Sequence, residues 1–566
     1  MLLGIDVGGT HTDAVVVDGG GILAWAKVRT DHDNLLRPIR TVLKEILSQV
    51  DPKQIKRLNI STTLSTNSII EGKTEEVGLL VASGPGIDPE YHRIGRHYHV
   101  LSGSIDHRGA NVQALDPAEI QTAAEACRRD GIKVFAAAVK FSTRNPEQEN
   151  QIAEALKPYA DYITKGHALS GLLNFPRRVA TACFNSAVWR VYNDFAWAVG
   201  ESVEEFGLET EVNVLKADGG TIPLDASRDA PVETILSGPA ASVMGIIALC
   251  DVREDSIILD IGGTTTDIAV FADGAPVIEN EGMTVGSYPT LVRALKIKSI
   301  GVGGDSIIRV SSSGVTVGPE RYGPCLAAAE DPSASVPALT DAMNRAGLFS
   351  FGDQEASCRG IEELARTRGL PSADLAESAV EYAVEKIRRA ALDLVDEINE
   401  KPVYTIHELL QGKVIVPQKV YLMGGPALSI AGRLSEAMGL EVIVPEHFSY
   451  ANAVGAAVTR TTMEIQVFAD TEKGHFLIPT LGVRKTIGRD FTQRQAEEEA
   501  AAALTGYLHE IGAGDQGLVP EITESESFEM VKGPSRTGRN IRVKCQVKPG
   551  VNLTFAPTGA GGDHAA

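Results

Sequence analysis

The pattern of apolar and polar positions divides the first 170 residues into alternating strand-like and helix-like segments. Short continuous apolar runs are typical of buried strands, whereas apolar residues at helical spacing indicate amphipathic helices. The apolar runs predict strands over 57–61, 77–82 and 134–141, and the helical spacing predicts helices over 35–50 and 117–130. Strands that alternate with helices in this way are typical of an α/β fold.

A long helical stretch follows over 177–206, with apolar side chains at every fourth position from Val179 and a proline, Pro176, at its start. Proline is favoured in the first turn of a helix, and we interpret this helix as the connection between two lobes. The chain is therefore expected to have an N-terminal lobe, a connecting helix, a second lobe and a small C-terminal α/β appendage, over 1–175, 176–206, 207–460 and 461–566. Within the later parts the pattern predicts helices over 372–399, 427–438 and 493–511, strands over 419–422, 465–468 and 541–547, and a disordered polar tail from Pro557.

One segment of the chain occurs twice. Asp6-Val-Gly-Gly-Thr-His-Thr-Asp13 returns as Asp260-Ile-Gly-Gly-Thr-Thr-Thr-Asp267, with six of eight positions identical. In each copy an apolar run precedes the two glycines and another follows, which predicts a β-hairpin with the polar residues at its tip. The plain alternative is that Gly-Gly-Thr only makes a tight turn, but the duplication favours a shared function for the two tips.

The residues at the two tips suit a polyphosphate and its metal ion. Glycine can adopt positive φ and places no Cβ between backbone N–H groups and an anion, and carboxylates are the hard oxygen ligands that Mg²⁺ prefers. The predicted nucleotide-binding residues are Gly8, Gly9, Thr10, Thr12, Gly262, Gly263, Thr264, Thr265 and Thr266. Asp6 and Asp260 are the predicted metal ligands and, with Asp13, the predicted catalytic carboxylates. Asp13 either acts as a base that positions water or caps its hairpin, and capping is the preferred interpretation for Asp267.

Three further segments place small residues where the backbone could approach a ligand. A second type of Gly-Gly turn, between a predicted strand and helix, is a predicted nucleotide contact made of Gly424, Gly425 and Pro426. Gly303 and Gly304 either contact phosphate or form a plain turn, and Asp305 would repel an anion there unless a metal ion or an arginine neutralises it. Ser237 precedes a helical segment, where it either faces the gap between the lobes or caps the helix.

Composition restricts the function classes. The net charge of -21 argues against nucleic acid as a partner, because its phosphates repel an acidic surface. No apolar stretch approaches the ~20 residues of a membrane span and the start lacks the features of a signal peptide, so we expect a cytoplasmic protein that does not enter membranes. The six cysteines show no C-x-x-C spacing and are predicted to be reduced thiols.

Four histidines lie close together in the sequence, at His92, His97, His99 and His107. Side chains two residues apart on a strand share a face, so His97 and His99 could act together. A zinc site needs a further donor, which the sequence does not identify, and solvated loop histidines are the favoured interpretation.

Several of these segments resemble the actin-like ATPase superfamily and, within it, the hydantoinase A and 5-oxoprolinase family. The matching segments cover about 1–460 and include Gly4–Asp13, Thr62–Asn67, Phe141–Pro146, Leu236–Gly245, Ser299–Ile307 and Thr340–Ala342. The resemblance implies a two-lobed α/β fold of the ribonuclease H-like type, in which 6–10 and 260–266 are phosphate loops and 423–427 is the adenosine turn. It also implies a substrate near Thr62, Thr63, Asn67, Ser237 and Asp305.

By this resemblance, the protein is expected to be an ATP- and Mg²⁺-dependent hydrolase that opens a cyclic amide or imide, such as a hydantoin or 5-oxoproline, after phosphorylation of a ring carbonyl oxygen. Members of the family often act with a separate B-type subunit, and a homo-oligomer is compatible with the sequence. Asp305 replaces a glycine of the family pattern and 320–327 also departs from it, which predicts an altered substrate. Two alternatives stay open: a small-molecule kinase or ATP-dependent carboxylase subunit, and an ATP-driven switch that responds to a partner protein.

Overall fold

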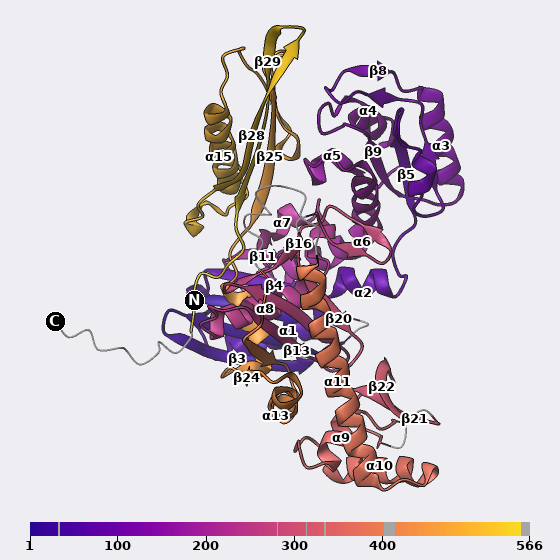
Figure 1. The fold of residues 1–566 in the computed structure, drawn as a ribbon, viewed down its shortest axis with the longest axis vertical. Helices are drawn as coiled ribbons and strands as arrows, with labels where there is room; N and C mark the ends of the chain where they lie inside the picture. Colours follow the sequence, from indigo (N-terminus) through magenta and orange to yellow (C-terminus); the bar gives the residue numbers. More distant parts are fainter. Residues whose placement is uncertain are drawn as a thin grey trace, which may run out of the picture.

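The computed structural model describes residues 1–31, 34, 36–279, 281–312, 314–332, 335–400 and 414–555. Figure 1 shows an elongated molecule with the strands β4 and β13 near its middle, a helical extension around α9 and α10 at one end, and two separate α/β units at the other. Among the described residues, no helix has both the length and the apolar composition that crossing a membrane requires. The predicted tail from Pro557 lies outside the described residues.

Two central sheets share one strand order. The first sheet runs β12-β11-β4-β1-β2-β3 and the second runs β15-β14-β13-β23-β24. In both, the opening hairpin is antiparallel and the next two strands are parallel to its first strand. The strands of the first sheet are β1 (Leu2–Val7), β2 (His11–Asp18), β3 (Gly21–Arg29), β4 (Arg57–Thr62), β11 (Glu211–Leu215) and β12 (Thr221–Pro223). Those of the second are β13 (Ser256–Ile261), β14 (Thr266–Ala272), β15 (Ala275–Pro276), β23 (Lys419–Met423) and β24 (Glu441–Ile443), and β20 (Ile297–Ile300) also pairs with β14. The duplication seen in the sequence therefore extends to whole sheets.

The first sheet continues past the expected boundary at residue 207. Strand β11 pairs in parallel with β4, with Val214 opposite Ile60, so the segment that we had assigned to the second lobe completes the sheet of the first. The physical reason is that the helix after the first unit returns the chain to the open edge of β4, where unpaired backbone groups accept another strand. The first sheet therefore extends beyond residue 207, where the second lobe was expected to begin. The other domain limits stay predictions.

A separate four-stranded sheet occupies the middle of the N-terminal region. Its order is β10-β9-β5-β6, all parallel, with helices on both faces. The elements are β5 (Val77–Ala82), β6 (Tyr98–Val100), α3 (Pro117–Arg129), β9 (Val134–Val139), α4 (Glu147–Leu156) and β10 (Tyr162–Lys165). The strand predicted over 134–141 ends at Val139, because the chain turns there and Phe141 takes a φ of 66°. This four-stranded sheet is separate from the first central sheet, so residues 1–175 do not form a single sheet.

The connecting helix α6 (Phe175–Glu205) is present and packs against both sheets of the N-terminal region. Val179, Cys183 and Ala187 join the core of the four-stranded sheet, whereas Tyr192 and Val199 join the core of the first central sheet. The Asn174 side chain accepts a hydrogen bond from the Arg177 N–H at the start of the helix, with Pro176 in the first turn. The predicted helix is thus present, but it joins the two sheets of the N-terminal region, and its role as the connection between the two lobes stays a prediction.

Two helices cross at very close range between the central sheets. They are α8 (Ser237–Leu249) and α14 (Ala451–Val458). A Cβ added to Gly455 would lie 2.1 Å from the Ala241 carbonyl oxygen, and one added to Gly245 would lie 2.2 Å from that of Ala451. Their core also includes Val15 from the first sheet and Ile258 from the second. Glycine is therefore required where these helices bring the two lobes together.

The helical predictions for the rest of the chain are confirmed. Figure 1 shows α9, α10 and α11 forming the extension that carries the hairpin β21–β22. The helices and hairpin strands are α1 (Leu36–Leu47), α2 (Leu64–Ile70), β21 (Ser306–Ser311), β22 (Gly314–Arg321), α9 (Leu339–Arg345), α10 (Gln354–Arg368), α11 (Ser372–Asn399) and α13 (Ala427–Met438).

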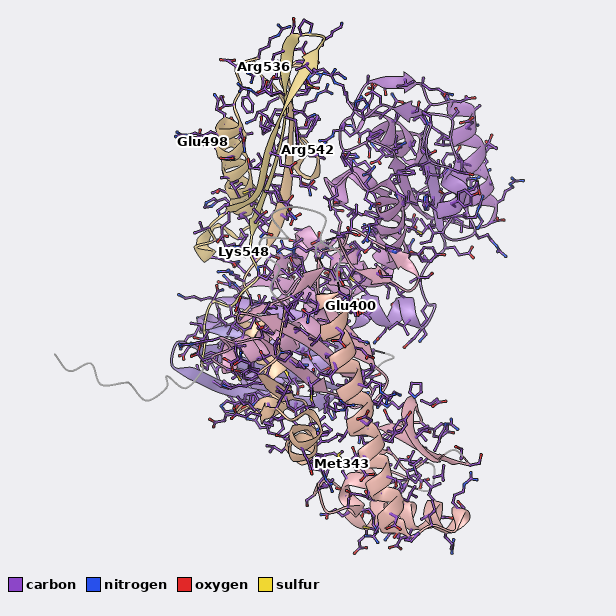
Figure 2. All side chains as sticks on the ribbon, in the orientation of Figure 1. Met343, Glu400, Glu498, Arg536, Arg542 and Lys548 are labelled. Atoms are coloured by element: carbon purple, nitrogen blue, oxygen red, sulfur yellow. The ribbon has the colours of Figure 1, made fainter. Side chains whose placement is uncertain are left out.

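The C-terminal appendage is a five-stranded sheet, β27-β26-β25-β29-β28, with helix α15 packed on one face. Figure 2 shows Arg536 at the far end of the appendage and Lys548 at the end that lies near the lobes. Its elements are β25 (Met463–Asp470), β26 (His475–Ile478), β27 (Val483–Thr486), α15 (Gln493–Glu510), β28 (Glu521–Lys532) and β29 (Ser535–Val547). The predicted strands and helix all occur here.

Candidate functional site

The two duplicated hairpin tips face each other. The Gly8 N–H donates to the His11 carbonyl oxygen at 3.1 Å and the Gly262 N–H donates to that of Thr265 at 2.9 Å, so Gly-Thr forms the turn in both hairpins. A Cβ added to Gly263 would lie 2.9 Å from the Thr10 Oγ1 atom. The tips of the two lobes are thus in contact, as expected for residues that share one ligand.

Four aspartates lie at the bases of these tips. Asp6 is directly opposite Asp13 in the first hairpin, and Asp260 is directly opposite Asp267 in the second. Asp260 accepts hydrogen bonds from Ser242 at 2.6 Å and from Asn452 at 3.3 Å.

Two carboxylate oxygens in this group are buried without a hydrogen-bond partner. The Oδ1 atoms of Asp6 and Asp267 form no hydrogen bond with the part of the chain that the structure describes, whereas Asp13 Oδ1 pairs with Lys27. Burial, followed by the neighbouring carboxylates, raises the pKa of Asp6 to about 7 and that of Asp267 to about 7. Burial also raises the pKa of Asp13 and Asp260. Buried carboxylates with free oxygens fit a divalent cation such as Mg²⁺, which would neutralise them.

Basic side chains lie around the first tip. Lys27 forms an ion pair with Asp13 at 2.8 Å and also donates to the Ser449 carbonyl oxygen of the second lobe at 3.0 Å. Burial lowers the pKa of His11 to about 4, and the charges of Lys27, Arg29 and Arg321 lower it further. A tip surrounded by cations favours an anionic ligand.

Arg321 forms an ion pair with Asp305, which is one of the two ways in which the sequence analysis allowed an anion to bind nearby. Its Oδ2 atom lies 3.3 Å from an Arg321 guanidinium nitrogen, and its Oδ1 atom accepts from the Cys325 N–H at 3.1 Å. The Arg321 guanidinium also donates to the Thr264 hydroxyl at 3.3 Å. Asp305 therefore orients an arginine at the second tip, and its place as a substrate contact stays a prediction.

The glycines of the site leave room for a ligand, but those at the tips do not have positive φ. Gly8, Gly9, Gly262 and Gly263 do not have positive φ, contrary to the expected conformation, because the two-residue turn closes without it. No described atom lies within 4 Å of a Cβ added to Gly9 or Gly425, so both leave room for a ligand. Gly424 has a φ of 95° and packs against the Ile261 carbonyl oxygen.

Gly303 and Gly304 support the second tip from behind. The Gly304 N–H donates to the Gly262 carbonyl oxygen at 2.9 Å, and a Cβ on Gly303 would lie 2.7 Å from the same atom. A Cβ on Gly304 would lie 3.5 Å from Pro426 Cγ, which brings the third glycine turn to the same place. For Gly303 and Gly304 the structure favours the turn interpretation over a phosphate contact.

Two threonines of the tips are not available to a ligand. Thr12 is fully buried with its hydroxyl 3.1 Å from that of Thr30, and Thr266 is fully buried and donates to the Val302 carbonyl oxygen at 2.7 Å. Both begin the returning strand and point away from the tip, which the alternation of strand side chains explains. Thr10, Thr264 and Thr265 are half-buried at the turns.

The predicted substrate residues divide into two groups. Thr62 and Ser237 are fully buried and tie strand β4 to helix α8, because the Ser237 hydroxyl donates to the Thr62 carbonyl oxygen at 2.9 Å. Ser237 therefore neither faces a ligand nor caps its helix, whose N-cap is Leu236. Thr63 and Asn67 are half-buried beside the first tip, where the Thr63 hydroxyl donates to the Val7 carbonyl oxygen at 3.3 Å.

Three residues of the site were not identified from the sequence, namely Asn452, Ser242 and Lys27. Asn452 follows Tyr450 on a short helix of small residues, and nothing in its neighbourhood indicates that it reaches a carboxylate. Lys27 had a usable signal, because folding the second hairpin of the first sheet about Gly19-Gly20 places it opposite Asp13.

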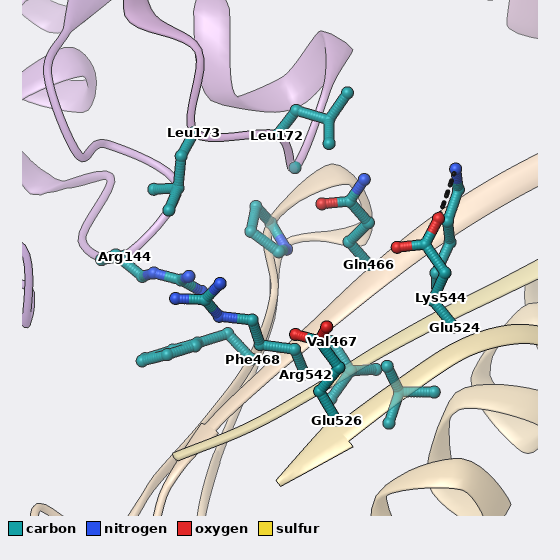
Figure 3. Close-up of a pocket in the computed structure, with 13 residues that line it drawn as sticks. Arg144, Leu172, Leu173, Gln466, Val467, Phe468, Glu524, Glu526, Arg542 and Lys544 are labelled. Atoms are coloured by element: carbon teal, nitrogen blue, oxygen red, sulfur yellow. Dashed lines mark hydrogen bonds and ion pairs between the residues drawn. The ribbon is translucent and has the colours of Figure 1, made fainter. Parts of the chain in front are cut away.

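A cavity of about 240 Å³ lies away from the tips, between the appendage and the loop at 171–173 (Figure 3). Arg144 stacks on Phe468 at 3.4 Å from the ring centre, and its buried Nε atom has no hydrogen-bond partner within the described chain. Burial, and then the nearby Arg542, lower the pKa of Arg144 to about 9. Arg144, Arg542 and Lys544 line the cavity together with Glu524 and Glu526, so side chains of both charges face it.

Two family models match the chain, one described as the hydantoinase/oxoprolinase N-terminal region over residues 2–160 and one as hydantoinase/oxoprolinase over residues 178–465. The chain belongs to the hydantoinase/oxoprolinase family. It is 25% identical to caprolactamase subunit alpha of Pseudomonas jessenii over 78% of this chain and 68% of that subunit. It is 20% identical to 5-oxoprolinase of Saccharomyces cerevisiae over 79% of this chain, but spans only 40% of that relative.

Solved structures of this family share the fold. A nucleotide-free structure of acetone carboxylase superposes with a TM-score of 0.73 at 17% identity, covering 96% of this chain and 87% of that one. The ATP-dependent caprolactamase of Pseudomonas jessenii superposes with a TM-score of 0.69 at 18% identity, covering 100% of this chain and 89% of that one. Together with the repeated sheet order, these likenesses confirm the predicted two-lobed, actin-like α/β fold.

Proposed function

We propose that this family member binds Mg²⁺-ATP between the two hairpin tips and uses it to open a cyclic amide or imide. The observation that carries the proposal is the group of buried carboxylates with unpartnered oxygens where the two tips meet. ATP use is further supported by the ATP-dependent caprolactamase and acetone carboxylase among the similar structures. Cytoplasmic location remains an expectation.

The chain's own residues divide the work of binding. Asp6 and Asp260 would hold Mg²⁺, directly or through its waters, and the bound ion would offset charge on the transferred phosphoryl group. Backbone N–H groups near Gly9 and Gly263, with the hydroxyls of Thr10, Thr264 and Thr265, would donate to phosphate oxygens. Arg321, held by Asp305, adds a positive charge on the same side. Asp13, paired with Lys27, is the proposed base or water-positioning group.

The proposed reaction begins with transfer of the terminal phosphoryl group from ATP to the ring carbonyl oxygen, which breaks the bond to ADP. Water then adds to the activated carbon, the ring C–N bond breaks, and the nitrogen takes a proton. A second water hydrolyses the resulting acyl phosphate to carboxylate and inorganic phosphate. The enzyme's contribution is positioning and charge neutralisation, because an unactivated amide nitrogen is a poor leaving group.

A carboxylase role is the second candidate. The chain is 24% identical to the beta subunit of acetone carboxylase from Xanthobacter autotrophicus over 57% of this chain and 50% of that subunit. Such a role would use the same ATP site and pass the activated group to a carboxylation step. Because several relatives are named as subunits, we propose that the chain acts with a partner subunit of the B type in either case.

The test is to incubate the protein with Mg²⁺-ATP and a panel of lactams and hydantoins, with and without a candidate partner subunit. Hydrolase chemistry predicts one phosphate released for each ring opened. A stable phosphorylated metabolite would indicate a kinase, and turnover that requires bicarbonate would indicate a carboxylase. ATP turnover that no metabolite changes, but that a protein raises, would indicate a switch.

A further inference from the structure

The four-stranded sheet of the N-terminal region brings together two histidines and a cysteine. One potential ligand atom from each of His97, His99 and Cys127 lies within 4.8 Å of the other two. The Cys127 sulfur is 3.5 Å from His99 Nε2. Figure 1 shows this unit, with β5, β9 and α3, well away from strands β4 and β13.

The fold explains why these side chains converge. His99 lies on edge strand β6, opposite Leu80 of β5, and Tyr98 between the histidines packs into the core on the α6 side. His97 and His99 therefore point to the other face of the sheet, which α3 covers. Cys127 is fully buried in the last turn of α3 and supplies the donor that the sequence alone did not identify.

Their burial contradicts the interpretation of His97 and His99 as solvated loop histidines. His97 is only 6% exposed and His99 is half-buried. The loop interpretation holds for His107, which is exposed.

Two carboxylates lie beside His97. Its Nε2 is 3.2 Å from a Glu76 oxygen, and its Nδ1 is 3.8 Å from an oxygen of Asp130, the C-cap residue of α3. A histidine that binds metal through one nitrogen commonly donates its other N–H to a carboxylate. Glu76 can therefore orient the ring while Nδ1 binds the metal ion.

The three donors, two imidazoles and one thiol, are of the kinds that zinc prefers. Zinc displaces the proton of a coordinating thiol and binds neutral imidazole, and a His₂Cys set with a carboxylate or water is within its usual chemistry.

We propose that His97, His99 and Cys127 bind a zinc ion, with water as the fourth ligand, and that the ion fastens helix α3 to edge strand β6. The site is structural and separate from the phosphate-binding tips. The ion would link α3 to the edge of the sheet formed by β6, a strand of only three residues, Tyr98–Val100.

The full-length protein is first tested without any substitution. Purified from zinc-containing medium and dialysed against a weak chelator, it is expected to keep about one zinc per chain. After removal of zinc with a strong chelator, adding Co²⁺ should give the intense near-ultraviolet absorption of a cobalt–thiolate bond. A protein that retains no zinc and shows no such absorption with Co²⁺ would overturn the proposal.

Variants then locate the site. Cys127→Ser and His99→Asn should each lose the bound zinc and the cobalt–thiolate absorption, whereas His107→Asn, from the same stretch of chain, should keep both. His99 is only half-buried, so His99→Asn is expected to fold even if Cys127→Ser does not. Zinc should raise the thermal midpoint of the parent but not of His99→Asn. Equal zinc retention by the parent and His99→Asn would overturn the assignment.

Discussion

Replacing Asp6 by asparagine is expected to stabilise the metal-free protein at neutral and alkaline pH. The pKa of Asp6 rises from 3.8 to about 7, chiefly because the carboxyl group is buried. Each pH unit between the folded and unfolded pKa corresponds to about 1.4 kcal/mol, so ionised Asp6 destabilises the fold by about 4 kcal/mol above neutral pH. This destabilisation is absent below pH 3.8, where the carboxyl group is neutral in both the folded and the unfolded state. It increases as the pH rises above 3.8 and is complete above about pH 7. Asparagine has the same shape and is neutral throughout.

The assay is thermal unfolding of both proteins in EDTA from about pH 4 to about pH 8.5. The midpoints should be similar at the acid end, and Asp6→Asn should unfold roughly 3 °C higher at the alkaline end. Adding Mg²⁺ should raise the midpoint of the parent more than that of the variant. Asp194→Asn, an exposed site on α6, removes a charge without changing a buried group and should show no such trend. A midpoint difference for Asp6→Asn that does not change with pH would refute the reasoning.

Two further predictions concern packing and the pH profile. Gly455→Ala should destabilise the protein by about 3 kcal/mol or more, measured by thermal unfolding, because its methyl group would meet the Ala241 carbonyl oxygen at 2.1 Å. Gly506→Ala, where a Cβ meets no described atom within 4 Å, should be neutral or slightly stabilising. Asn452→Ala should shift the acid limb of the pH–rate profile upward by about one pH unit, because its amide lowers the pKa of Asp6. An unshifted limb would remove Asn452 from the site.

Local pattern was sufficient to predict most of the fold. The helix over 372–399 and the helix over 427–438 occur with the predicted limits, because each has a continuous amphipathic face and clear ends. The duplicated tips were predictable because a Gly-Gly-Thr turn is recognisable without knowledge of the surrounding structure. What the pattern could not show was that β11 returns to the first sheet, since sheet membership depends on pairing across 150 residues of chain.

The candidate site was predictable only where its residues lie within the motifs. Asp6 and Asp260 could be recognised in this way, whereas Asn452 reaches Asp260 only because α8 and α14 cross closely. Thr12 and Thr266 belong to the motif but point into the core, because side chains alternate along a strand and the motif does not mark where the strand begins. His99 lies on strand β6 and Cys127 near the end of helix α3, so their proximity is a tertiary property.

The central claim is that the facing tips hold the phosphates of ATP, and Gly9→Val tests it most directly. No described atom lies within 4 Å of a Cβ at Gly9, so the variant should fold as the parent does, while its side chain fills the space proposed for phosphate. Gly19→Val is the matched control, because Gly19 is equally open and lies in the turn at the other end of β2.

The measurement is calorimetric titration of the parent and both variants with a non-hydrolysable ATP analogue and Mg²⁺. The account predicts that Gly9→Val keeps the parental unfolding temperature and loses nucleotide binding by at least roughly a hundredfold, a cost of about 2.7 kcal/mol or more, whereas Gly19→Val binds as the parent does. Parental affinity in Gly9→Val would contradict the placement of the nucleotide between the tips.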